Sequence, residues 1–208
     1  MRWPDPAAAE AALSAALGVG VTLRTATVPL TVEDLSPGER AAWERLPGDG
    51  PRRRDWLLGR AALKPLVDGA DTAGVAFPHR TLSLSHSGPM AVAVSVDGAG
   101  GGGGGGAGVD LETRAGADPR AARFFLHEDE QAASPHAVLR LWTVKEALFK
   151  ATPDNADRRL LDYRVTDPSA ATGTATDVAG RTFRYASGLL DRYRLTVALC
   201  LEDARAAV

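Results

Sequence analysis

Apolar and polar positions along the first half of the chain predict a mixture of helices and short strands. The helices are expected near residues 5–17, 32–46 and 51–68, and the strands near 21–28, 81–86 and 90–96. Thr31 and Asp34 match a capping box at the start of the second helix. Ser87-Gly88-Pro89 separates the last two strands.

The second half has a loosely similar composition. Helices are expected near 118–132 and 135–151, and strands at 108–112 and near 160–166, 172–178, 181–187 and 192–201. The longer helix carries an apolar stripe that is expected to face a core: Val138, Leu141, Trp142, Leu148 and Phe149. Because each half offers helices and a small antiparallel sheet, we predict an α+β fold, a pseudo-dimer of two similar lobes over residues 1–99 and 100–208.

Composition narrows the class of protein. A chain of 208 residues with 45% hydrophobic content can bury a core, and its net charge of −2 argues against a nucleic-acid binder. The single cysteine, Cys200, excludes a disulfide within the chain and favours a reducing cytoplasm. The amino-terminal segment is typical of an amphipathic helix rather than a signal peptide, and no apolar run reaches membrane-spanning length. A soluble, cytoplasmic protein is therefore expected.

A run of seven glycines, residues 100–106, separates two predicted strands. Polyglycine has high conformational entropy and no side chains to pack, so a flexible loop is expected. The run lacks the Gly-Lys-Ser/Thr ending of a P-loop, and its match to a dinucleotide fingerprint is trivial.

The segment from Trp142 to Lys150 contains the most informative chemistry. A helix brings Glu146 and Lys150 onto one face, and alternation in the strand at 108–112 directs Asp110 and Glu112 to one side. The same Glu-to-Lys spacing also occurs in ordinary surface ion pairs. However, the chain has only three lysines, Lys64, Lys145 and Lys150, and two lie in this segment. We therefore expect three carboxylates and a lysine to converge.

Three carboxylates without a Cys/His cluster favour Mg²⁺, which usually keeps positions for substrate phosphates. Arg52, Arg53 and Arg54 open a helix on which Arg52, Arg53 and Arg60 can lie near one face. Guanidinium groups bind oxyanions with paired hydrogen bonds. A solvated basic helix end is the alternative. His86 is either a phosphate donor or a structural histidine, and a hydrolase triad with Ser85 is disfavoured because adjacent strand residues point to opposite faces.

These motifs, in this order, resemble the Sfp-type 4′-phosphopantetheinyl transferases. The resemblance rests on Leu58-Gly59-Arg60, Ser85-His86-Ser87, Gly108-Val109-Asp110-Leu111-Glu112, and the segment Trp142-Thr143-Val144-Lys145-Glu146-Ala147-Leu148-Phe149-Lys150. It covers residues from about 50 to 151. It implies a monomer that moves the 4′-phosphopantetheine of coenzyme A to a serine of an apo acyl or peptidyl carrier protein, with release of adenosine 3′,5′-bisphosphate.

The resemblance also implies roles for single residues. Asp110, Glu112 and Glu146 would bind Mg²⁺, Glu146 would also accept the proton of the carrier serine, and Lys150 would lie near the scissile phosphate. Coenzyme A would be held by Arg52 or Arg53, together with Arg60, Ser85, His86, Asp110 and Lys150. Trp142 and Lys145 are also motif positions; we assign Trp142 to packing and leave the role of Lys145 open.

Many relatives carry a Gly-Lys-Pro element before the Ser-His-Ser strand, and residues 74–80 lack its lysine, which His79 or Arg80 would have to replace. Two other functions use the same residues. A Mg²⁺-dependent phosphohydrolase would consume coenzyme A or a nucleotide without a carrier protein, and a non-catalytic paralogue would only bind the carrier.

Overall fold

The structure is a computed structural model of the chain, and it describes residues 1–48, 50–67, 71–97, 105–113, 119–130, 132 and 134–201. The α-helices are α1 (Pro6–Leu17), α2 (Pro37–Glu44), α3 (Pro51–Leu63) and α4 (Pro135–Ala151). The strands are β1 (Arg2–Trp3), β2 (Val21–Ala26), β3 (Leu82–Ser87), β4 (Met90–Val96), β5 (Ala107–Thr113), β6 (Tyr163–Val165), β7 (Thr172–Asp177), β8 (Thr182–Leu190) and β9 (Tyr193–Cys200). Short 3₁₀ helices are η1 (Val32–Asp34), η2 (Lys64–Leu66), η3 (Thr72–Gly74), η4 (Pro119–Phe124) and η5 (Leu160–Asp162).

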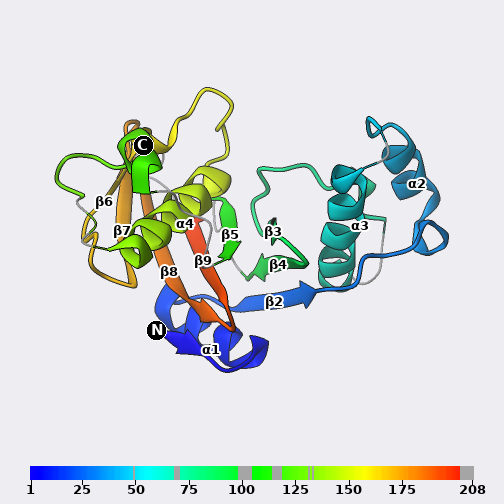
Figure 1. Cartoon of the computed structure of the whole chain (residues 1–208), viewed down its shortest axis with the longest axis horizontal. Helices are drawn as coiled ribbons and strands as arrows, with labels where there is room; N and C mark the ends of the chain where they lie inside the picture. Colours follow the sequence, from blue (N-terminus) through cyan, green and yellow to red (C-terminus); the bar gives the residue numbers. More distant parts are fainter. Residues whose placement is uncertain are drawn as a thin grey trace, which may run out of the picture.

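The strands form two sheets, which Figure 1 shows side by side. The smaller sheet has the order β2-β4-β3 and is antiparallel throughout. The larger sheet has the antiparallel order β5-β9-β8-β7-β6, and β1 adds to β8 in parallel. These antiparallel sheets with helices confirm the predicted α+β class. The division into two similar lobes stays a prediction.

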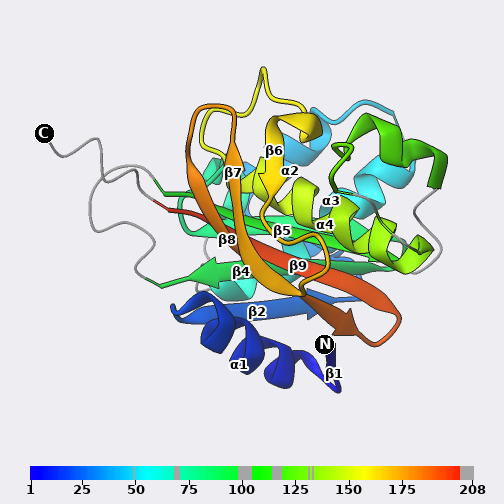
Figure 2. The same cartoon turned by 90° about the vertical axis from the view of Figure 1, so that its left-hand side faces the viewer.

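Helices cover both faces of the sheets. Helix α3 packs on the smaller sheet through a buried cluster that includes Leu58, Leu63 and Ala93, and α4 packs on the larger sheet through Leu141, Leu148 and other apolar residues. Helix α1 lies against the opposite faces of both sheets, below them in Figure 2. The core under α1 joins valines of β4 to apolar residues of β5, β8 and β9, so the two sheets share it.

The two sheets meet at their edges through side chains. The edge strands are β3 and β5, and serines on one side of β3 reach the backbone of β5. The hydroxyls of Ser83, Ser85 and Ser87 accept the amide hydrogens of Val109, Leu111 and Thr113 at 2.9, 3.3 and 3.2 Å, respectively. We call these three residues the serine row. The row fixes β5 relative to β3 without a backbone ladder.

Most predicted elements are confirmed, but two of the predicted helices have other bounds and a third does not form. The helix expected at 32–46 is divided into η1 and α2, because Pro37 disfavours helical backbone at Ser36 and a second capping box starts there with Glu39. The expected capping box of Thr31 and Asp34 is present. The helix expected at 51–68 ends at Leu63 and continues as η2, where Pro65 lacks an amide donor.

The helix expected at 118–132 is wrong, since η4 is the only helical element among the described residues of this range, 119–130 and 132. Phe125 and Glu130 are both buried in this segment and both contact α4. Residues five apart lie about 140° apart around an α-helix, so a regular helix would not turn both toward one neighbour. Most of the glycine run lies outside the described residues. Within the described part of the chain, no helix is long and apolar enough to cross a membrane.

Candidate functional site

The acidic strand β5 runs beside α4 at the seam between the two sheets. Even-numbered residues of β5 face α4, because the odd-numbered ones pack into the core under α1. Gly108 allows a close approach, since a Cβ there would lie 1.9 Å from the carbonyl oxygen of Ala147. This packing brings Asp110 and Glu112 against the face of α4 that carries Trp142 and Lys150.

Asp110 is buried and paired with a lysine. Its Oδ1 accepts from Lys150 Nζ at 2.7 Å and from the Ser85 hydroxyl at 3.1 Å, and Lys150 Nζ also donates to the Ser85 oxygen at 3.1 Å. Its Oδ2 is buried and has no hydrogen-bond partner among the described residues. One carboxylate oxygen is therefore held by the protein while the other lacks a donor.

Glu112 receives two hydrogen bonds from different elements. Trp142 Nε1 of α4 donates to Oε1 at 3.2 Å, and the Ser87 hydroxyl of β3 donates to Oε2 at 3.2 Å. Burial and the neighbouring Asp110 raise the pKa of Glu112, and these two donors oppose that shift. Two hydrogen bonds from different elements therefore hold the Glu112 carboxylate in position.

Glu146 lies one helical turn before Lys150 on α4. Burial, followed by the charge of Asp110, raises the pKa of Glu146, and Glu112 adds to this effect while Lys150 opposes it. The negative charges of Asp110, Glu112 and Glu146 therefore interact with one another. The structure thus joins Ser85, Asp110 and Lys150 by hydrogen bonds. Glu112 and Glu146 lie near enough to Asp110 for its charge to raise their pKa values.

Carboxylate oxygens are suitable ligands for a hard cation such as Mg²⁺. Within the described part of the chain, no hydrogen-bond donor contacts Asp110 Oδ2, which leaves this oxygen available to a cation. Among the described residues, no group of three or more His, Cys, Asp and Glu side chains is arranged so that it could hold a metal ion. The protein instead places the Lys150 ammonium against Asp110. Magnesium at these acids therefore remains a proposal.

The remaining predicted residues lie on the α3 side of the seam. His86 is exposed and alternates with the serine row, so its ring is on the same face of β3 as Leu84, which packs against α3. Arg52 is exposed at the start of α3. Ser85 contacts Asp110, whereas His86 lies on the opposite face of β3, so Ser85, His86 and Asp110 do not form a hydrolase triad.

Two of the predicted phosphate-binding arginines make contacts within the protein. Arg53 Nη2 donates to the carbonyl oxygen of Leu46 at 3.0 Å, and its guanidinium lies 4.4 Å from the ring centroid of Trp43. Arg60 Nη1 donates to the Thr72 oxygen at 3.0 Å, and its guanidinium lies over Trp56. Periodicity placed these residues on α3 but did not reveal such partners.

His79, which was considered as a substitute for the missing lysine, has a structural contact. Its Nδ1 accepts the amide hydrogens of Thr81 and Leu82 at 3.2 and 3.1 Å, just before β3. Arg80 is exposed. His79 is half-buried, so Arg80 is the more accessible of the two substitutes.

Trp142 makes a contact beyond the packing expected of it, and Lys145, whose role the sequence left open, has partners in the protein. Trp142 packs edge to face on Phe125, as expected, but its indole N–H also reaches Glu112. Lys145 is completely buried, pairs with Glu130 and donates to the Tyr163 oxygen at 2.8 Å. Burial lowers the pKa of Lys145, and Glu130 opposes that shift. Lys145 therefore links α4 to β6, away from the acids.

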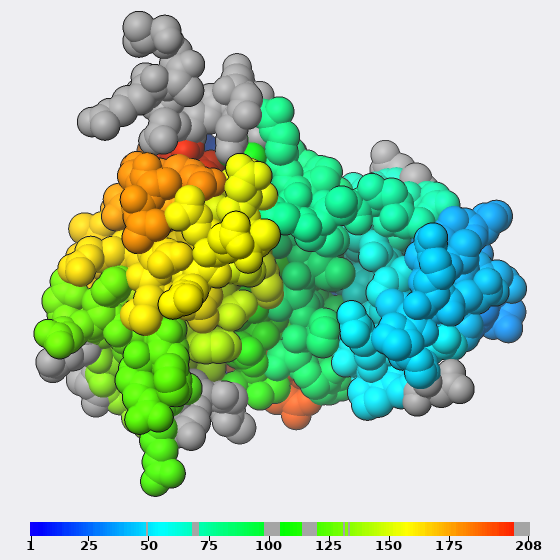
Figure 3. All heavy atoms as spheres, turned by 90° about the horizontal axis from the view of Figure 1, so that it is seen from above, coloured from blue at the N-terminus to red at the C-terminus, as the bar shows by residue number. Residues whose placement is uncertain are grey.

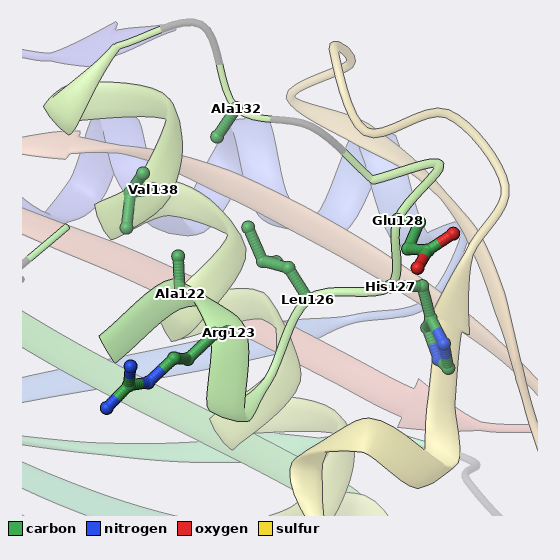
Figure 4. Close-up of a pocket in the computed structure, with 7 residues that line it drawn as sticks. All are labelled: Ala122, Arg123, Leu126, His127, Glu128, Ala132 and Val138. Atoms are coloured by element: carbon green, nitrogen blue, oxygen red, sulfur yellow. The ribbon is translucent and has the colours of Figure 1, made fainter. Parts of the chain in front are cut away.

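A pocket of about 660 Å³ lies beside the amino-terminal end of α4 (Figure 4). It is lined by Ala122, Arg123, Leu126, His127, Glu128, Ala132 and Val138. Next to it, Phe124 is 63% exposed, and the Arg123 guanidinium stacks on its ring at 4.7 Å.

Figure 3 shows the C-terminal half and the α2–α3 part at opposite ends of one face of the molecule.

The family comparison concerns the half of the chain that contains the acids. A family model described as the 4′-phosphopantetheinyl transferase superfamily matches residues 106–198, slightly less than half of the chain. The matched segment includes Asp110, Glu112, Glu146 and Lys150. This match supports the resemblance at the level of the superfamily. It does not separate the Sfp type from the holo-[acyl-carrier-protein] synthase type.

Among solved structures, one that matches is the holo-[acyl-carrier-protein] synthase of Thermotoga maritima. The match has 16% sequence identity and a TM-score of 0.36, and it covers 47% of this chain and 63% of that chain, less than two thirds of its length. A similarity this low carries no argument about activity. The comparison with curated proteins gave no significant match.

Proposed function

We propose that the protein transfers 4′-phosphopantetheine from coenzyme A to a serine of an apo acyl or peptidyl carrier protein, as Sfp-type enzymes do. The supporting observation is the convergence of Asp110, Glu112, Glu146 and Lys150 within the segment that matches the transferase superfamily. The carrier serine oxygen would bond to the phosphorus that bears the pantetheine arm. The bond from this phosphorus to adenosine 3′,5′-bisphosphate would break, and the serine proton would pass to a base.

Glu146 is the proposed base. A serine hydroxyl needs a positioned acceptor for its proton, and a carboxylate with a raised pKa is a better acceptor near neutral pH. Lys150 would stabilise the negative charge that develops on the leaving phosphate. Asp110, Glu112 and Glu146 would hold Mg²⁺, which when bound would offset the charge of the pyrophosphate.

We assign the nucleotide end of coenzyme A to the α3 side of the seam. Arg52 and His86 are exposed there, and guanidinium and imidazole groups suit the 3′-phosphate. Arg53 and Arg60 would have to exchange their present carbonyl partners for phosphate oxygens. Ser85 is buried and would act near the pyrophosphate through Lys150 and Asp110 rather than at the nucleotide.

The surface around the pocket is the proposed docking site for the carrier. Carrier proteins are usually acidic around their serine, and Arg120, Arg123 and exposed Phe124 lie along η4. This docking strip is proposed to span residues 114–126, of which 114–118 lie outside the described residues. Arg120→Glu/Arg123→Glu should weaken carrier modification, whereas Arg45→Glu, an exposed arginine on the other part of the molecule, should not. Unchanged modification by the double variant would remove η4 from the docking site.

The proposal is tested by intact-protein mass spectrometry of several apo carrier proteins incubated with the protein, coenzyme A and Mg²⁺. We expect a metal-dependent mass gain of one phosphopantetheine group, and near-complete loss of that gain for Glu146→Gln with the fold intact. Consumption of coenzyme A without a carrier would indicate a phosphohydrolase instead. Coenzyme A binding without a mass gain on any carrier would favour a non-catalytic role.

A further inference from the structure

Glu112 is held at both carboxylate oxygens by donors from opposite sides of the seam. Trp142 Nε1 reaches Oε1 from α4, and the Ser87 hydroxyl reaches Oε2 from β3, each at 3.2 Å. A carboxylate with one donor on each oxygen has little freedom to rotate. The contact matters here because the charges of Asp110 and Glu146 repel Glu112.

Both donors are fixed by contacts of their own. The Trp142 ring packs edge to face on the buried ring of Phe125, with a centroid distance of 5.1 Å and an interplanar angle of 80°. The Ser87 oxygen accepts the Thr113 amide hydrogen, so its own hydrogen is directed to Glu112. Each donor therefore reaches Glu112 from a rigid element.

We propose that Trp142 and Ser87 are positioning residues that orient the Glu112 carboxylate for cation binding. This proposal rests on the proposed function, because it assigns a purpose to Glu112 in the acidic site. Partners that orient a ligand typically change metal affinity by about 10–100-fold when they are removed. The role differs from packing alone, since it depends on one N–H and one O–H group.

The serine row offers a matched control. Ser83 accepts a β5 amide hydrogen as Ser87 does, and its hydroxyl has no carboxylate contact among the described residues. Trp142→Phe removes the N–H and keeps an aromatic ring against Phe125. Ser87→Ala and Ser83→Ala each remove one hydroxyl from the row, so a difference between them reports the bond to Glu112.

The experiment is calorimetric titration of each full-length variant with Mg²⁺ alone, alongside thermal unfolding. We expect Trp142→Phe and Ser87→Ala each to weaken Mg²⁺ binding by about 10-fold, and Ser83→Ala to change it by less than about twofold. A second readout needs no metal. The chain has four tryptophans, so Trp142→Phe assigns one of four indole N–H resonances, and Glu112→Gln should shift that resonance selectively.

The outcomes separate this proposal from the proposed function. Wild-type affinity for Mg²⁺ in both Trp142→Phe and Ser87→Ala would overturn the positioning role while the metal site stands. The positioning role would also be overturned if the indole N–H resonance of Trp142 did not shift in the Glu112→Gln variant. If the wild-type protein does not bind Mg²⁺, the metal part of the proposed function fails and the positioning role fails with it.

Discussion

Lys150 of α4 and Asp110 of β5 form an ion pair across the seam between the two sheets, with 2.7 Å between Nζ and Oδ1. The Ser85 hydroxyl of β3 contacts both residues, so one cluster joins the helix, the larger sheet and the smaller sheet. Asp110 is buried, whereas the Lys150 side chain keeps 28% of its surface exposed. The pair is therefore partly screened, and its ammonium remains accessible from solvent.

Replacing Lys150 by Ala should affect both activity and stability. If the ammonium stabilises the leaving phosphate, phosphopantetheine transfer should fall by about 100-fold or more. Because the pair is partly exposed, the loss of unfolding free energy should be modest, about 1–2 kcal/mol. Transfer rates and urea unfolding test this. Lys64→Ala breaks an ion pair with Glu39 and should spare transfer per folded molecule, and equal losses of transfer in both variants would contradict the assignment.

Gly108 should tolerate no side chain. A Cβ at this position would lie 1.9 Å from the Ala147 oxygen and 2.6 Å from the Ala151 nitrogen, both backbone atoms of α4. Gly108→Ala must push α4 from β5, so we expect a loss of about 3 kcal/mol in unfolding free energy. Gly74→Ala is the control, since a Cβ there meets no atom within 4 Å. Chemical denaturation that shows equal stability for the two variants would refute the close packing.

The sequence predicted the elements of the acidic site well because their signals are local. Ser134 and Pro135 mark the start of α4, and its i,i+4 spacing places Glu146 beside Lys150. Alternation in β5 correctly placed Asp110 and Glu112 on one side. The serine row was also visible as alternating serines in β3, but its purpose required knowledge that β3 and β5 are both sheet edges.

What the sequence could not predict depends on contacts between distant segments. The helix expected at 118–132 does not form because two tertiary contacts determine this segment instead. Phe125 packs on Trp142, and Glu130 pairs with Lys145. The arginines of α3 were assigned to phosphate by residue type, although Arg60 finds a carbonyl oxygen in η3. Residue type shows what a side chain can bind, and only the fold shows which partner is near.

Glu39 predicts how stability depends on pH. Burial works to raise its pKa, but hydrogen bonds from Thr72, Ser36 and Lys64 outweigh burial and lower the pKa from 4.5 to about 2. Because the folded-state pKa is depressed, the stabilisation is complete above pH 4.5 and is lost as the pH falls toward 2. A shift of this size corresponds to about 3 kcal/mol.

Glu39→Gln should therefore destabilise the protein at pH 7 and flatten the pH dependence below pH 4.5. Urea unfolding at several pH values between 7 and 2.5 measures both effects. Glu44→Gln, at an exposed position of α2, is the control and should behave as the wild type. Parallel loss of stability in the Glu39→Gln variant and the wild type across this range would show that Glu39 does not carry the effect.

Lys145 and Glu146 are neighbours in the sequence, and their variants should separate stability from transfer. The ammonium of Lys145 is fully buried against Glu130, which also accepts the amide hydrogens of His127 and Val165 at 2.9 and 2.8 Å. Lys145→Met would leave the buried Glu130 carboxylate without its counter-charge. We expect this variant to lose about 3–5 kcal/mol of unfolding free energy.

Adding Glu130→Gln to Lys145→Met should restore much of that loss, because the charge that lacked a partner is removed as well. A double-mutant cycle by urea unfolding measures the coupling, which should exceed about 1 kcal/mol, whereas additive effects would show that the pair contributes little as a pair. Per folded molecule, Lys145→Met should keep most of the transfer rate, since Lys145 contacts β6 and Glu130 rather than the acids. A loss of transfer comparable to that of Glu146→Gln, with the variant shown to be folded, would move Lys145 from a structural role into the reaction.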